Sequence, residues 1–199
     1  PASARVQLIE AGPRLLASFP PALSDKAAQQ LKRLGVEVLT GAAVQNIDEH
    51  GYVREGQPVA ARTVLWAAGV AASPLGRALG APLDRAGRVQ VQPDLSLPGH
   101  PDVFVAGDLA ALMQASGQPV PGVAPAAKQM GALVARNIAA KLKGQPTQPF
   151  VYQDFGNLAT IGRMAAVVDL RGLRFSGLLA WWFWLAAHVF FLIGFRNRL

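Results

Sequence analysis

An uncharged run of 18 residues near the C-terminus, LLAWWFWLAAHVFFLIGF at positions 178–195, limits the fold of this chain more than any other feature. As a helix it would be about 27 Å long, slightly short of the ~30 Å hydrocarbon core of a bilayer. A buried core helix is the alternative, but arginines on both sides and tryptophans near one end are more typical of a membrane boundary. We therefore expect a membrane-associated helix, and whether it spans the bilayer or lies in the interface stays open. The flanking arginines are Arg171, Arg174, Arg196 and Arg198, and the tryptophans are Trp181, Trp182 and Trp184.

Composition excludes several classes of function. Apolar residues make up 51% of the chain and charged residues only 16%, below the usual quarter or so. The net charge of +7 comes from scattered basic residues without interleaved aromatics, which argues against nucleic-acid binding and fits anionic lipid headgroups better. Cysteine is absent, so disulfides, thiolate catalysis and cysteine metal sites are excluded. The histidines, His50, His100 and His188, are too far apart for a metal-ligand motif, and we expect no metal.

The N-terminal part predicts a parallel α/β unit. Residues 5–9 read as a strand ending in Glu10, and residues 24–34 read as a helix capped by Ser24 and followed by Gly35. Residues 36–39 read as a second strand. Strand, helix and strand at this spacing indicate a βαβ unit.

Further along, residues 43–64 alternate between apolar and polar side chains around turn signals at His50-Gly51 and Glu55-Gly56, which predicts small antiparallel strands. The other expected elements are buried strands at 63–69 and 103–106, a short helix at 73–79, a strand at 88–91, a helix at 123–142, a linker at 144–150 and two strands within 157–170 that turn at Gly162-Arg163.

Two carboxylates follow predicted strands and are candidate ligands. Glu10 could accept hydrogen bonds from an adenosine ribose, where its charge would disfavour a 2′-phosphate and so favour NAD over NADP. The alternative is a solvated turn residue. Asp108, behind Gly107, could bind a polyol chain or could cap the next helix. Small residues at 67–70 would allow a flat cofactor to approach the backbone closely.

Four segments in order, VLWAAGV, DVFVAGD, APAAKQMG and the tail FGNLATIGRMAAVVDL…LLAWWFWLAAHVFFLIGFRNRL, resemble the C-terminal half of a flavoprotein with two dinucleotide-binding domains. The tail is similar to that of the bacterial type II NADH:quinone oxidoreductases, which do not pump protons. The resemblance implies a partial Rossmann-like α/β fold with a C-terminal membrane-associated helical segment. It divides the chain into the remainder of an NADH-binding domain (1–69), the C-terminal part of an FAD-binding domain (70–150), and C-terminal strands with a membrane-anchoring helix (151–199).

The resemblance also implies site roles. Asp108, with Gly107, would bind the FAD ribityl chain, and Glu10 would bind the adenosine ribose of NADH. Gln129 would lie beside the flavin and the quinone entrance. Many family members have Gln where this chain has Pro125 and Met130, which puts the polar quinone contacts in question. The residues that would line the nicotinamide and flavin region, or place a helix N-terminus near the flavin, are Ala68, Gly69, Val70, Ala126, Ala127 and Gly131.

The activity implied is transfer of a hydride from NADH to FAD, followed by transfer of two electrons from the reduced flavin to a membrane quinone. The reaction would take place at the cytoplasmic face of a bacterial inner membrane. The partners would be the quinone and the lipid surface, and a homodimer stays open. Sulfide:quinone-type oxidoreductases are the second enzyme class, although they depend on cysteine. A non-catalytic membrane-tethered module is the third reading. Neither G-x-G-x-x-G motif of the family occurs, so we expect a fragment that alone binds FAD poorly and lacks dehydrogenase activity.

Overall fold

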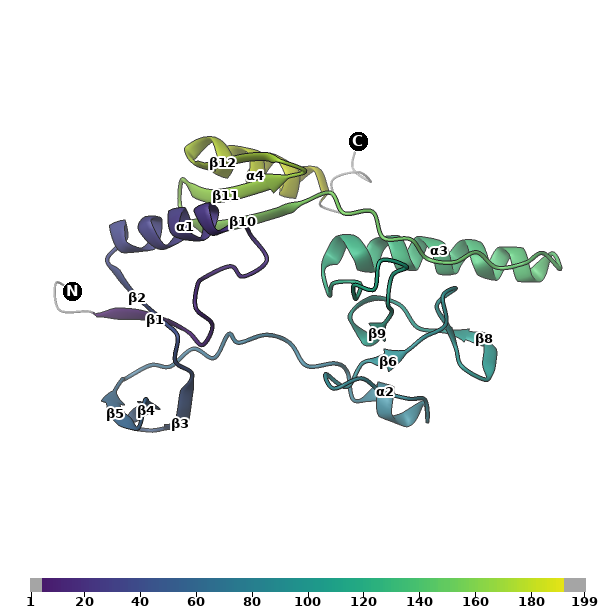
Figure 1. Ribbon diagram of the computed structural model, residues 1–199, viewed down its shortest axis with the longest axis horizontal. Coiled ribbons are helices and arrows are strands. Elements are labelled where there is room, and N and C mark those ends of the chain that lie inside the picture. The colour runs from purple at the N-terminus through teal and green to yellow at the C-terminus, as the bar shows by residue number, and fades with distance from the viewer. Residues whose placement is uncertain (1–4, 192–199) are drawn as a thin grey trace. The chain divides into compact units, whose positions relative to one another are not determined.

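The computed structural model describes residues 5–191 (Figure 1). It divides into two compact units, Pro1–Trp66 with Phe155–Leu199, and Ala67–Asp154. The first unit has two small apolar cores and the second unit has one.

The first unit begins with the predicted βαβ arrangement. Strands β1 (Val6–Glu10) and β2 (Val36–Thr40) pair in parallel, with Glu10 opposite Thr40, and helix α1 (Pro21–Arg33) connects them. Gly35 has φ of +82°, a conformation that favours glycine and ends the helix as predicted.

The predicted cap of α1 is wrong. The helix begins at Pro21, because proline suits the first turn, and no side chain caps it. Ser24 is inside the helix and buried, and its Oγ accepts a hydrogen bond of 2.6 Å from Arg14 Nη1. Arg14 also donates to the carbonyl oxygens of Leu16, Ala17 and Phe19 and so holds the loop before α1.

The predicted antiparallel strands are present as β3 (Val44–Asp48), β4 (Gly51–Arg54) and β5 (Gln57–Ala60). Gly51 has φ of +147°, and a Cβ there would collide with the carbonyl oxygen of Val59. Glycine is therefore required at this turn.

The buried strand expected at 63–69 is not found. These residues have no regular structure and are exposed, with Leu65 at 87% and Trp66 at 67%. Their composition favours a strand, but a strand needs a hydrogen-bonded neighbour, and the structure describes none here.

The C-terminal part of this unit is a three-stranded antiparallel sheet between two helices. Strands β10 (Asn157–Gly162) and β11 (Ala165–Leu170) form the predicted hairpin. Strand β12 (Leu173–Gly177) is a third strand, which was not predicted from the sequence, directly before the uncharged run. Successive residues of β11 point to opposite faces. Val167 packs with Phe19, Leu23 and Ala27 on the α1 side. On the other face, Ala166 and Val168 pack against Ala180 of helix α4 (Leu178–Phe191), with Trp181 and Trp184 around them.

Helix α4 covers only part of the uncharged run, and residues 192–195 lie outside the described residues. The opposite face of α4 is exposed, so the helix is not a buried core helix. None of the helices within residues 5–191 has the length and apolar character needed to cross a membrane.

The second unit is built around helix α3 (Ala124–Leu142), which confirms the prediction for 123–142. The predicted short helix is α2 (Leu75–Ala78), and the strand expected at 88–91 is reduced to β6 (Val89–Gln90), paired in parallel with β9 (Ala110–Ala111). The core contains Leu95, Val105, Met130 and Leu133, among others.

The buried strand expected at 103–106 is displaced. Strand β8 is His100–Phe104, and it pairs with β7 (Ser96–Leu97) as an antiparallel hairpin whose β8 residues are mostly exposed. Of residues 103–106, Val105 is buried in the core and Phe104 packs against it, just before the 3₁₀ helix η1 (Gly107–Leu109).

Candidate functional site

Gly107 allows η1 to pack directly against the first turns of α3. Its φ is +75°, and a Cβ on it would lie 3.5 Å from the Cβ of Ala127. Its N–H donates to Met130 Sδ at 3.3 Å. Gly107 and Ala127, to which the resemblance gives roles at one flavin, are therefore brought together. In the sequence, Met130 is notable only because many family members have Gln at this position. In the structure it is buried, and its sulfur accepts the N–H of Gly107.

Asp108 presents an exposed carboxylate on this turn. The residue at the cap position of η1 is Ala106 and that of α3 is Val123, and neither helix has a side-chain cap. The capping role considered for Asp108 is therefore not realised. A Cβ on Gly122 would lie 3.8 Å from Asp108 Oδ1, which places this carboxylate by the loop that enters α3.

The N-terminus of α3 is apolar, small and uncapped. Proline occupies its first turn, and no acidic residue is found there. Ala126 is buried, and a Cβ on Gly131 would meet no atom within 4 Å. The free N–H groups give this end a partial positive charge, so it can stabilise a negative charge placed against it.

Gln129 has defined partners. Its Nε2 donates to the carbonyl oxygen of Gln153 at 2.9 Å, and its Oε1 accepts from the N–H of Gln153 at 2.9 Å. Sequence reasoning predicted the position of Gln129 on α3 but not these contacts, because Gln153 lies in an irregular segment without a pattern.

The residues Ala68, Gly69 and Val70 lie in the exposed, irregular segment. Val70 is 92% exposed, and Gly69 has φ of +109° with no atom within 4 Å of a Cβ built on it. Their backbone is open to a ligand, but no strand holds it in the part of the chain that the structure describes.

Glu10 lies at the end of β1, in the first unit. Its Oε1 accepts the N–H of Gly12 at 2.7 Å, so Glu10 does stabilise a turn. A Cβ on Gly12 would lie 3.2 Å from the same oxygen. Within residues 5–191, Oε2 of Glu10 has no hydrogen-bond partner, so it can accept a ligand hydroxyl while Oε1 holds the turn.

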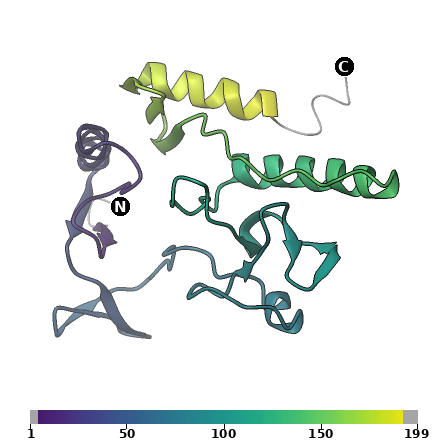
Figure 2. The same ribbon diagram turned by 45° about the vertical axis from the view of Figure 1, so that its right-hand side comes forward.

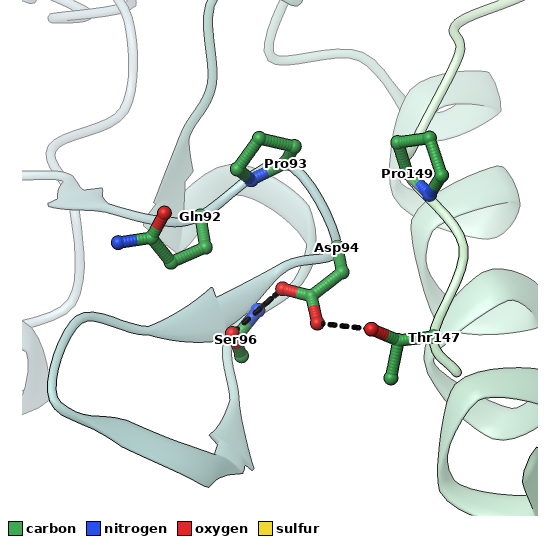
Figure 3. Close-up of a pocket in the computed structure, with 6 residues that line it drawn as sticks. All are labelled: Gln92, Pro93, Asp94, Ser96, Thr147 and Pro149. Atoms are coloured by element: carbon green, nitrogen blue, oxygen red, sulfur yellow. Dashed lines mark hydrogen bonds between the residues drawn. The ribbon is translucent and has the colours of Figure 1, made fainter. Parts of the chain in front are cut away.

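An open hollow in the second unit was not predicted (Figure 3). Asp94 Oδ1 accepts hydrogen bonds from the N–H and Oγ of Ser96, at 3.0 and 2.6 Å, and Oδ2 accepts one from Thr147 Oγ1 at 2.7 Å. Burial alone would raise the pKa of this carboxyl, but the hydrogen bonds from Ser96 and Thr147 outweigh it and hold the pKa below its usual value. The hollow is lined by Gln92, Pro93, Asp94, Ser96, Thr147 and Pro149.

Comparison with known proteins gives a consistent result. The family model for pyridine nucleotide-disulphide oxidoreductase matches residues 2–131, and the model for the NDH2 C-terminal domain matches residues 155–199. The chain is 43% identical to the type II NADH:quinone oxidoreductase Ndh of Mycobacterium tuberculosis, over 98% of the chain and 44% of that protein. It is 32% identical to the mitochondrial internal alternative NAD(P)H-ubiquinone oxidoreductase A1 of Arabidopsis thaliana, over 98% of the chain and 41% of that protein. The chain thus spans less than half the length of these relatives.

Solved structures share the fold. NDH2 from Plasmodium falciparum in complex with NADH aligns with a TM-score of 0.83 at 17% identity, over 95% of this chain and 55% of that one. The sulfide:quinone oxidoreductase of Aquifex aeolicus aligns with a TM-score of 0.75 at 17% identity, over 96% of this chain and 50% of that one. At such identities the likeness shows only the fold, which is Rossmann-like and mixed α/β.

Proposed function

Because this chain belongs to the pyridine nucleotide-disulphide oxidoreductase family and carries an NDH2 C-terminal domain, we propose that it forms part of a respiratory NADH:quinone oxidoreductase. The observation that supports this most strongly is the identity of 43% to the mycobacterial relative, which extends over 98% of the chain. We assign residues 1–69 to NADH binding, 70–150 to FAD binding and 151–199 to the membrane-facing part.

The turn at Gly107-Asp108 fits a flavin with a polyol chain. The Asp108 carboxylate is exposed and caps no helix, so it is free to accept hydroxyl hydrogens. The small side chain of Ala127 and the absence of one at Gly131 would let a flat ring approach α3, while Ala126 is buried in the core of the unit. The chemistry that FAD supplies when bound is acceptance of a hydride from NADH and delivery of two electrons to a quinone.

The remaining roles belong to the chain itself. The uncapped N-terminus of α3 would stabilise negative charge on a reduced ring, and Gln129 would face the quinone side. Gly69, with Ala68 and Val70, would present open backbone to the nicotinamide. Glu10 would accept the ribose hydroxyls of NADH and repel a 2′-phosphate.

The exposed face of α4 supports a membrane location. Leu179 is 75% exposed and Trp182 is 55% exposed, on the side away from the sheet. We infer that this face lies in the interface of a bacterial cytoplasmic membrane, on its cytoplasmic side, where membrane quinone is available.

The test is steady-state quinone reduction by a polypeptide that contains these residues, reconstituted with FAD in membranes. NADH should be the preferred donor over NADPH, and Glu10→Ala should lower that preference because the charge that repels a 2′-phosphate is lost. A parallel assay with sulfide separates the two quinone-reducing classes. Reduction driven by sulfide but not by NADH would contradict the proposal.

A further inference from the structure

The segment that follows α3 returns along the helix without forming a strand. Residues 145–154, which we call the connection, run beside α3 in both views (Figures 1 and 2). Such a segment needs partners for its backbone N–H and C=O groups. Two side-chain amides of α3 provide them.

Asn137 holds the connection at Gln148. Its Nδ2 donates to the carbonyl oxygen of Gln148 at 2.9 Å, and its Oδ1 accepts the N–H of Gln148 at 2.9 Å. Nδ2 also donates to the carbonyl oxygen of Asp94 at 3.1 Å. Asn137 is only 1% exposed, so both of its amide hydrogens are used in a buried position.

Gln129 makes the same two-way contact with Gln153, nearer the start of the helix. In each case one side-chain amide makes the pair of hydrogen bonds, one donated and one accepted, that the backbone of a neighbouring strand would otherwise make. We call Asn137 and Gln129 the amide clamps.

The stretch between the clamps is also fixed. Thr147 donates to Asp94, as Figure 3 shows, and the N–H of Phe150 donates to the carbonyl oxygen of Pro93 at 2.8 Å. Phe150 and Tyr152 pack against the core of the unit. Loss of the Asn137 contact therefore removes one of several contacts that together set the course of the connection up to Gln153.

The clamps also fix the orientation of the Gln129 amide. Because Oε1 must face the N–H of Gln153, Nε2 must face its carbonyl oxygen, and the reversed amide would bring like groups together. One hydrogen of Nε2 is then left as a donor for a carbonyl oxygen.

We propose that Asn137 is a positioning residue, which fixes the connection so that Gln129 presents this N–H donor to a quinone carbonyl. This rests on the proposed function, since the ligand is the quinone of that reaction.

The first test is hydrogen exchange of the N–H groups of Gln148 and Gln153, measured by NMR in the full-length enzyme. Asn137→Leu should speed exchange at both positions by about tenfold or more. Gln129→Ala, at a half-buried position that should not threaten folding, should do the same at both positions. Ile138→Ala, at a 44% exposed position on the same helix, leaves both clamps intact and should leave both rates unchanged. Faster exchange confined to the clamp that was removed would overturn the proposal.

The second test uses the full-length enzyme with FAD. Asn137→Asp keeps the Oδ1 acceptor but loses the Nδ2 donor, and it should raise the KM for a short-chain benzoquinone severalfold. The rate of NADH oxidation by ferricyanide, which needs no quinone, should not change. An unaltered quinone KM would overturn the proposal. If the unsubstituted enzyme reduces no quinone, the proposed function fails, and the role of Asn137 toward the quinone fails with it, whereas coupled exchange would still establish the clamps.

Discussion

At the scale of single residues, the Asp108 carboxylate is the side chain that we expect to bind FAD directly. We expect Asp108→Ala to weaken FAD binding by roughly 10- to 100-fold, because a hydrogen bond to a charged group contributes about 1.5–3 kcal/mol. The measurement is flavin bound per polypeptide in a full-length protein that contains these residues. Asp102→Ala is the control, since Asp102 is exposed and forms an ion pair with Lys141. Equal flavin content in wild type and Asp108→Ala would show that Asp108 is only a surface residue of the turn.

Asp94 gives a pH-dependent prediction. Although burial opposes its charge, the hydrogen bonds from Ser96 and Thr147 lower the pKa of its carboxyl below the usual 3.8. A lowered pKa stabilises the folded state above the pKa of the unfolded chain, and that contribution is lost as the pH falls through the folded value. The midpoint of thermal unfolding should therefore fall more steeply below about pH 4 in wild type than in Asp94→Asn. Parallel profiles in the two proteins would show that this network does not contribute to stability.

At the scale of elements, strand β11 connects the two cores of the first unit. Val167 and Val168 are both fully buried but face α1 and α4 respectively. We expect each change to alanine to lower the free energy of unfolding by roughly 1–3 kcal/mol. Hydrogen exchange should accelerate mainly in α1 for Val167→Ala and mainly in α4 for Val168→Ala. Val103→Ala, at a 40% exposed position, should change the free energy of unfolding by less than about 0.5 kcal/mol. The same exchange pattern in both buried variants would contradict the two-faced arrangement.

Helix α4 gives a prediction about lipid. Leu179→Ser should weaken binding to anionic vesicles by about tenfold or more, because the exposed leucine would no longer be buried in the interface. The measurement is co-sedimentation with the vesicles. Leu142→Ser, at an 84% exposed position at the end of α3, should bind as wild type does. Equal loss in both variants would indicate non-specific adhesion and not docking through α4.

The sequence predicted elements best where the signal is local. The periodicity of α3, the glycine after α1 and the turns between β3, β4 and β5 depend on nearby residues, and the structure confirms them. The strand expected at 63–69 was wrong because strand formation depends on a partner elsewhere in space. The start of α1 was misplaced because Pro20-Pro21 determines it, whereas Ser24 is held inside by Arg14.

At the scale of the whole molecule, the site was predicted in part. The resemblance assigns Gly107 and Ala127 to one flavin without predicting their contact, and Glu10 at the end of β1 follows from the βαβ pattern. The contacts of Gln129 with Gln153, and of Asn137 with Gln148 and Asp94, could not be predicted, because they join positions 11 to 43 residues apart through irregular backbone.

The most direct test of the central claim is anaerobic stopped-flow spectroscopy of the FAD-loaded full-length protein. We predict that NADH bleaches the flavin absorbance within one turnover, that a membrane quinone restores it, and that NADPH at the same concentration bleaches it far more slowly. A flavin that NADH does not reduce, or that stays reduced when quinone is added, would contradict the assignment.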